Sequence, residues 1–121
     1  MAEVTPIWHY RARCLKVIDG DTLELLIDTG FRTTRTERVR LLGVDTPELR
    51  SSDPEERERA QAAKTYVEDW LFPDSTAHFD EWPLLIYSQK GDSFGRWLAE
   101  VQRNGSDLAS DLIDAGHGVE Y

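Results

Sequence analysis

Two acidic blocks, each at the end of a strand-like run, constrain this chain more than any other feature. The first block, residues 17–22, reads VIDGDT, and the second, residues 38–48, reads RVRLLGVDTPE. Apolar and polar residues alternate at the start of the second block, as they do in a half-buried strand. The chain must therefore fold so that carboxylates stand at strand ends, where their oxygens can hold a hard cation.

A third block supplies a second arginine to go with Arg40 of the second block. Residues 93–99 read SFGRWLA, in which Gly95 lets the backbone turn sharply just before Arg96. Two guanidiniums can grip one phosphate bidentately. Together with a cation and a spare glutamate, they make up a phosphodiester-cleaving site.

Hydrophobic periodicity predicts five short strands. We expect them at residues 10–18, 22–27, 37–44, 84–87 and 97–102. The third strand should end before Pro47, because proline removes a backbone donor that a ladder needs. With helices between and after them, these strands favour a small β-barrel with flanking helices, an α+β fold.

Two helices are expected. Asp53 can cap the first, Pro54 suits its first turn, Glu56 stands at capping-box spacing, and Pro73 stops it. The residues predicted to face inward in this helix are Ala60, Ala63, Val67, Trp70 and Leu71. The second helix is expected over residues 108–115, with inward side chains at Leu108, Leu112 and Ala115.

The three blocks also carry a family resemblance. The order DGDT, RxRLLGVDTPE, FGRWLA and a Leu-Ile-x-x-Gly helix end resembles the staphylococcal nuclease (thermonuclease-like) family, from about Tyr10 to Tyr121. The resemblance implies a five-stranded OB-fold barrel, here as one domain over residues 1–121 with its core in 10–121. Relatives usually carry another helix near the C-terminus. Because the chain stops at Tyr121, we expect that helix to be absent.

The resemblance implies a metal site at the mouth of the barrel. Its ligands would be Asp21, Asp45 and the backbone carbonyl of Thr46, with Asp19 in an outer-shell role. Oxygen ligands favour Ca²⁺, with Mg²⁺ or Mn²⁺ as substitutes, over zinc. The alternative for residues 19–21 is an ordinary turn. An EF-hand loop is excluded, because Leu23 and Gly30 occupy positions that need ligands.

The resemblance also implies roles in catalysis and substrate binding. Arg40 and Arg96 would clamp the phosphate, and Glu48 would either deprotonate or only position the attacking water. Phe94 and Tyr121 would stack on bases. Ser93 stands where relatives often have lysine, so this chain lacks one phosphate contact there.

The formal net charge of −9 is unusual for a protein that meets nucleic acid. The distribution of the charges along the chain explains how a net negative charge and nucleic-acid binding can coexist. Residues 1–50 carry eight basic and eight acidic side chains, whereas residues 51–121 carry six and fifteen. The acidic surface away from the proposed site weakens long-range attraction of a polyanion, so we expect modest affinity.

Other sequence features set the context. Cys14 is expected to be a packed strand residue, since apolar neighbours flank it. The N-terminal residues include no apolar run long enough for a signal peptide, and no stretch reaches membrane-spanning length. We therefore expect a cytoplasmic protein that does not enter the membrane, and we expect a monomer.

The leading hypothesis is a Ca²⁺-dependent nuclease that hydrolyses DNA, with RNA as a second substrate. The resemblance implies attack by water that releases a 5′-hydroxyl and a 3′-phosphate. The alternative is a catalytically silent nucleic-acid or protein binding module with the same fold. A third hypothesis, an acidic inhibitor that mimics DNA, fits the charge but leaves Arg40 and Arg96 unexplained.

Overall fold

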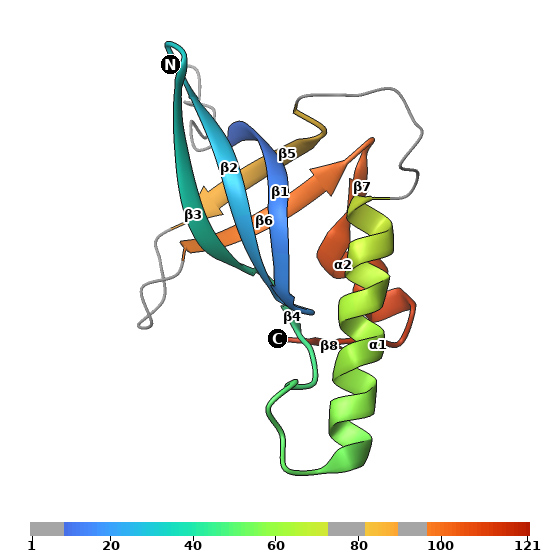
Figure 1. The fold of residues 1–121 in the computed structure, drawn as a ribbon. Helices are drawn as coiled ribbons and strands as arrows, with labels where there is room; N and C mark the ends of the chain where they lie inside the picture. Colours follow the sequence, from blue (N-terminus) through green and yellow to red (C-terminus); the bar gives the residue numbers. More distant parts are fainter. Residues whose placement is uncertain (1–8, 73–81, 90–96) are drawn as a thin grey trace.

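The computed structural model of this chain describes residues 9–72, 82–89 and 97–121 (Figure 1). Two predicted site residues, Phe94 and Arg96, lie outside the described residues, as does Pro73.

A closed five-stranded barrel forms the body of the fold (Figure 1). Its strands are β1 (His9–Asp19), β2 (Thr22–Gly30), β3 (Thr33–Leu41), β5 (Leu84–Gln89) and β6 (Trp97–Arg103). Neighbouring strands run antiparallel in the order β3-β2-β1-β5-β6. The barrel closes through a parallel pairing in which Val39 of β3 lies opposite Trp97 of β6. The predicted OB-fold barrel is confirmed.

Three two-residue strands were not predicted. They are β4 (Val44–Asp45), β7 (Ser106–Asp107) and β8 (Val119–Glu120). The predicted strand over residues 37–44 is wrong at its end, because β3 stops at Leu41 and the chain turns at Gly43, whose φ is +83°. Strand β4 then pairs antiparallel with β8, which brings the C-terminal residues beside the second acidic block.

Helix α1 (Pro54–Leu71) begins as expected, with the predicted Asp53 as its N-cap. The Asp53 side chain accepts a hydrogen bond from the Glu55 backbone N–H (3.0 Å), as an N-cap residue does. The predicted capping box is wrong, because Glu56 accepts a hydrogen bond from Ser51 (2.5 Å) instead of reaching back to Asp53. The Ser51 hydroxyl in turn accepts from the backbone N–H of Asp53 (3.1 Å).

Helix α2 (Leu108–Asp114) is capped by Asp107, which accepts from the Ser110 backbone N–H at 3.0 Å. Leu108 and Leu112 are buried as predicted, whereas Ala115 is exposed because the helix ends one residue earlier. Neither helix in the described part of the chain is long and apolar enough to cross a membrane.

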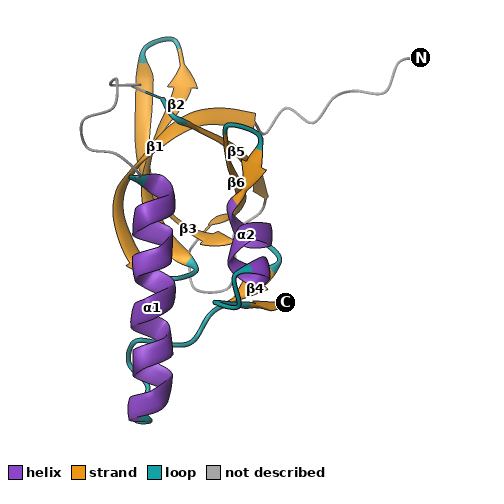
Figure 2. Cartoon of the chain, turned by 90° about the vertical axis from the view of Figure 1, so that its right-hand side faces the viewer, coloured by secondary structure: helices purple, strands orange, loops and turns teal. Residues whose placement is uncertain are grey.

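The core lies inside the barrel and extends under α1 and α2, which pack on the same side of it (Figures 1 and 2). Alternate residues of β2 and β3 point inward, as the two-residue period of a strand requires. The two helices are joined by Trp70, whose indole N–H donates to Asp111 (2.9 Å). Cys14 packs against this core as predicted, and burial raises the pKa of its thiol to about 11.

Candidate functional site

Arg40 stands at the centre of the candidate site. Its Nη2 donates to Asp45 Oδ1 at 3.0 Å and lies 3.4 Å from Asp21 Oδ2. Its Nη1 lies 3.3 Å from each of two backbone carbonyls, those of Leu41 and Val44. The Arg40 side chain is 13% exposed, so the guanidinium is largely withdrawn from water. Both carboxylates therefore face one positive group in a partly dehydrated setting, where charges interact more strongly than in water.

Asp21 is fixed by the turn between β1 and β2. Its Oδ2 accepts the Thr46 backbone N–H, and its Oδ1 accepts the Thr22 hydroxyl, both at 3.2 Å. Its own backbone carbonyl accepts from Leu41 (2.9 Å), which ties the turn to the end of β3. Asp21 is buried. These contacts hold its carboxylate in one orientation before any ligand arrives.

Asp45 and Thr46 come from the other acidic block, at β4. The Asp45 side chain is 48% exposed, so it faces solvent on one side and Arg40 on the other. Thr46 is buried, and its hydroxyl finds no hydrogen-bond partner among the described residues. The hydroxyl lies against Gly20, where an added Cβ would approach it to 2.8 Å. The two acidic blocks are thus in close contact at this point.

Tyr121 completes this cluster from the C-terminal end. The pairing of β8 with β4 and a hydrogen bond from the Tyr121 backbone N–H to the Gly43 carbonyl (3.2 Å) bring it there. Its ring centre lies 4.8 Å from the Arg40 guanidinium carbon, which is cation–π distance. Tyr121 as a whole is 79% exposed. One face of Tyr121 can therefore lie on Arg40 while solvent, or a base, contacts the remainder.

The donor set at this site suits a hard cation held loosely by oxygen. Two carboxylates converge on Arg40 Nη2, and the Thr46 backbone N–H donates to Asp21. Within the described residues, no three His, Cys, Asp or Glu side chains gather closely enough to form a closed metal cage. A Ca²⁺ ion here would need water or substrate phosphate to complete its shell of 6–8 oxygens.

Asp19 lies in the same negative region. Its carboxylate accepts from the Gly20 backbone N–H at 3.0 Å. Burial raises its pKa, and the negative charges of Asp21 and Glu48 raise it further, while Lys64 acts in the opposite direction. Asp19 therefore interacts electrostatically with carboxylates of both acidic blocks. An outer-shell carboxylate would occupy such a position.

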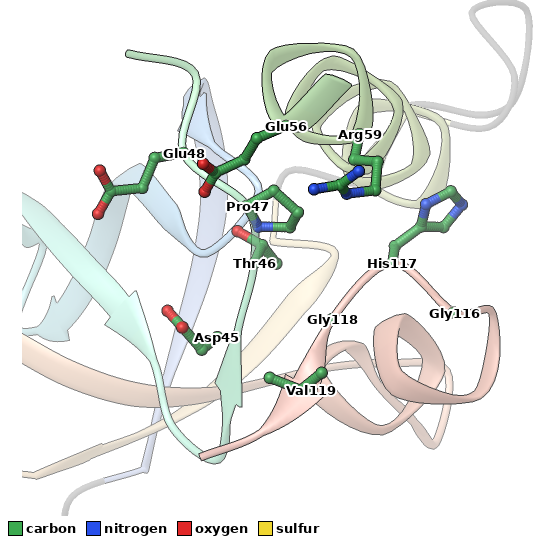
Figure 3. Close-up of a pocket in the computed structure, with 10 residues that line it drawn as sticks. All are labelled: Asp45, Thr46, Pro47, Glu48, Glu56, Arg59, Gly116, His117, Gly118 and Val119. Carbon is green, nitrogen blue, oxygen red and sulfur yellow. The ribbon is translucent and has the colours of Figure 1, made fainter. Parts of the chain in front are cut away.

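Glu48 lines a cavity of about 420 Å³ beside the cluster (Figure 3). The second acidic block forms one wall of the cavity, through Asp45, Thr46, Pro47 and Glu48. Helix α1 contributes Glu56 and Arg59, and residues 116–119 form the remaining wall. Glu48 is exposed and, in Figure 3, extends away from Arg59 and His117. It is positioned to meet a ligand that enters beside Asp45.

Sequence reasoning missed two residues of this cavity. Arg59 is exposed on the helix, with no motif to distinguish it from its charged neighbours. His117 follows Gly116, whose φ of +80° turns the chain out of α2, and its ring packs on Tyr66 with centres 4.9 Å apart. Only the packing of α2 against α1 brings these residues to the second acidic block, and no local pattern reveals that.

Five predicted site residues thus meet in one network of contacts: Asp21, Arg40, Asp45, Thr46 and Tyr121. Asp19 and Glu48 lie at its border. The remaining two, Phe94 and Arg96, lie outside the described residues.

The comparison with known families decides how this network is classified. A family model described as staphylococcal nuclease homologue matches residues 38–121, which include the end of β3, the second acidic block and Tyr121. The chain belongs to the staphylococcal nuclease homologue family. Membership of this family suggests a nuclease-type or nucleic-acid-binding module.

Three relatives are similar over most of this chain. An uncharacterized protein of Methanocaldococcus jannaschii is 29% identical and covers 93% of the chain and 60% of its own length. Protein ParB of Escherichia coli is 29% identical over 88% of the chain and 49% of its own length. An uncharacterized protein of Bacillus anthracis is also 29% identical, over 90% of the chain and 46% of its own length. The chain therefore spans about half the length of the relatives it matches.

Proposed function

We propose that this chain is a Ca²⁺-dependent nuclease that hydrolyses phosphodiester bonds of DNA, with RNA as a second substrate. The observation that carries the proposal is the convergence of Asp21 and Asp45 on Arg40, beside the Thr46 backbone. A cation site and a phosphate-gripping arginine are the two parts that phosphodiester hydrolysis needs most.

Arg40 is the residue whose state must change when substrate binds. In the free protein its guanidinium pairs with both carboxylates, and its single positive charge offsets only one of their two negative charges. Bound Ca²⁺ would supply positive charge to the carboxylates and polarise the phosphoryl oxygen. Arg40 would then be free to turn its forked donors toward the phosphate, where negative charge builds up in the transition state. Arg96 would supply the second guanidinium, on the strength of its motif alone.

Glu48 would serve the attacking water. Its carboxylate accepts a proton from water as the oxygen bonds to phosphorus, or orients that water for attack. The bond from phosphorus to the 5′-oxygen breaks, and that oxygen takes a proton from solvent water to leave as a 5′-hydroxyl, so the phosphate stays on the 3′ side. The exposure of Glu48 in a cavity that also contains Asp45 supports this role.

A second candidate function is nucleic-acid binding without cleavage. One observation favours it: both terminal nitrogens of Arg40 already have acceptors within the protein. If those contacts persist in the complex, the site holds phosphate through a cation and does no chemistry.

A digestion assay separates the two functions. Single-stranded DNA and plasmid DNA are incubated with the protein and Ca²⁺, with and without a chelator. We expect cleavage that the chelator abolishes and that Asp45→Asn reduces by roughly 10²-fold or more, the scale for a lost stabilising group. Asp28→Asn is the matched control, because Asp28 of β2 pairs with Arg11 of β1 (2.6 Å) and does not belong to the candidate site. Cleavage that survives chelation, or binding without any cleavage, would contradict the proposal.

A further inference from the structure

The hairpin between β2 and β3 ends in a turn whose residues do not suit its backbone. Gly30 pairs with Thr33, so Phe31 and Arg32 form a two-residue loop. Their φ angles are +55° and +61°. Hairpin turns with positive φ at both central positions strongly prefer Asn, Asp or Gly, because bulky side chains are strained there. Here an aromatic residue and an arginine occupy both positions.

The strain is not offset by packing. The Phe31 side chain is 104% exposed, so its ring contributes nothing to the core. Arg32 is exposed as well, and it forms no ion pair with any described residue. A strained turn that displays an apolar ring in water is poorly explained by folding, and such sites cluster where a protein binds something.

Strand β3 connects this turn to the candidate site. Its register with β2 is unbroken from Thr34 to Arg40. Side chains alternate along a strand, so Thr34, Thr36 and Arg38 share a face with Arg40. On the opposite face Val39 and Leu41 are buried, which places the shared face on the outside of the barrel. Thr34, Thr36 and Arg38 are exposed.

We name these three residues together with Phe31 and Arg32 the hairpin track. Strand β3 runs from its end near β4 to the hairpin with β2 at the top of Figure 1. At about 3.3 Å per residue, nine residues separate Phe31 from Arg40 by at most about 30 Å. Along one strand of B-form DNA the rise is about 3.4 Å per nucleotide, so at this spacing at most roughly nine nucleotides span this length.

The charges of the track favour a polyanion. Arg38 forms no ion pair with a described residue, although Glu24 of β2 lies opposite it in the register. The nearest acidic residue to the turn along β2, Asp28, is already neutralised by Arg11 of β1 at 2.6 Å. The two free guanidiniums and the threonine hydroxyls are donors for phosphate, and an exposed ring is a platform for a base.

We propose that the hairpin track binds the single-stranded DNA that extends from the catalytic site, with Phe31 stacking on a base about nine nucleotides away. This inference rests on the proposed function, which places a phosphate of the same strand at Arg40. Substrates long enough to reach the turn gain affinity from it, and shorter ones do not.

The double variant Phe31→Asn, Arg32→Gly tests the track, because it replaces the turn with residues its backbone prefers. We expect a melting temperature equal to or above that of the wild type. With labelled, non-cleavable oligothymidine of about twenty nucleotides in Ca²⁺, fluorescence anisotropy should give a Kd raised at least about fivefold, the low end for losing one base stack. Cleavage of a substrate of about four nucleotides, which spans roughly 14 Å, should be unchanged.

The matched control is Phe72→Ala. It removes another exposed aromatic ring, at the C-terminal end of α1, and should leave the Kd unchanged. An unaltered Kd in the double variant, an equal loss for both substrate lengths, or a loss seen only with RNA of the same length would overturn the proposal. Anisotropy reports binding even if the wild type cleaves nothing, so the track and the nuclease function fail separately.

Discussion

The two ends of β3 use arginine in opposite ways. At one end Arg40 is 13% exposed and contacts two carboxylates, two carbonyls and the Tyr121 ring. Arg32, in the turn at the other end, and Arg38, two residues from Arg40, are exposed and form no ion pair with the described residues. The buried arginine is oriented in advance by its neighbours, whereas the exposed ones carry charge that only a ligand can use. The difference distinguishes the proposed catalytic site at Arg40 from a surface that we expect to bind a polyanion.

The free energy of unfolding should also respond differently to substitutions around Arg40 and on the hairpin track. Removing one partner of a buried ion pair leaves an uncompensated charge, which typically costs about 3–5 kcal/mol. An exposed ion pair contributes about 0–1 kcal/mol. Substitutions around Arg40 should therefore change both folding and activity, and substitutions on the track should change ligand binding alone.

The largest expected effect is that of Arg40→Lys. Lysine keeps the charge but loses the forked donors, so turnover should fall by roughly 10²-fold or more. Arg38→Lys is the matched control two residues away on the same face, and it should change kcat little. Steady-state cleavage of a short oligonucleotide measures both. Equal kcat values in the two variants would erase the distinction between Arg40 and the exposed arginines of the hairpin track.

Glu48→Gln should lower kcat by at least about 10²-fold, the low end for general acid–base catalysis. The amide keeps the size of the side chain but is a far weaker proton acceptor. Glu56→Gln alters another carboxylate of the same cavity, one that pairs with Ser51, and should have a small effect. Single-turnover kinetics isolates the chemical step. A kcat for Glu48→Gln equal to that of Glu56→Gln would remove Glu48 from the mechanism.

Gly20→Ala tests how tightly the two acidic blocks are packed together. The new Cβ would lie 2.8 Å from the Thr46 hydroxyl and 3.1 Å from the Ala63 side chain. Overpacking of this kind typically costs about 1–3 kcal/mol. Urea unfolding measures the loss. Gly43→Asn is the control, since the space there is open and asparagine tolerates the positive φ, and it should cost less.

The smallest effect is a pH dependence from Cys14. Burial raises the pKa of this thiol from 9.0 to about 11, so the unfolded chain loses the proton first as pH rises. Its contribution to stability is therefore complete below pH 9.0 and is lost as pH rises toward about 11. Unfolding measured across this range should show a steeper fall for the wild type than for Cys14→Ala. Parallel curves would mean that the thiol is not desolvated.

Much of the site was predictable because its residues stand in local motifs. Asp21, Arg40 and Asp45 stand in the sequence blocks that resemble the staphylococcal nuclease family, and that resemblance implied their roles. Periodicity and turn residues predicted short strands and a small barrel, because these signals are local. The resemblance implied that this barrel is an OB-fold.

What the sequence did not reveal depends on contacts between distant segments. The ion pairs of Arg40 with both carboxylates were not predicted, because they require β2, β3 and β4 to be assembled first. Arg59 and His117 reach the cavity only through helix packing. The turn at Phe31 and Arg32 contradicts the usual turn preferences, and the backbone angles alone make that visible.

The central claim is that Asp21 and Asp45 can exchange the guanidinium of Arg40 for Ca²⁺. The most direct test is the melting temperature as a function of Ca²⁺ concentration, with a nucleoside 3′,5′-bisphosphate present. We expect the wild type to be stabilised progressively, since a ligand that binds only the folded state raises its stability. Asp45→Asn, which alters the more exposed ligand, should lose this response. A wild-type melting temperature that does not change with Ca²⁺, or an equal rise in the Asp45→Asn variant, would contradict the account.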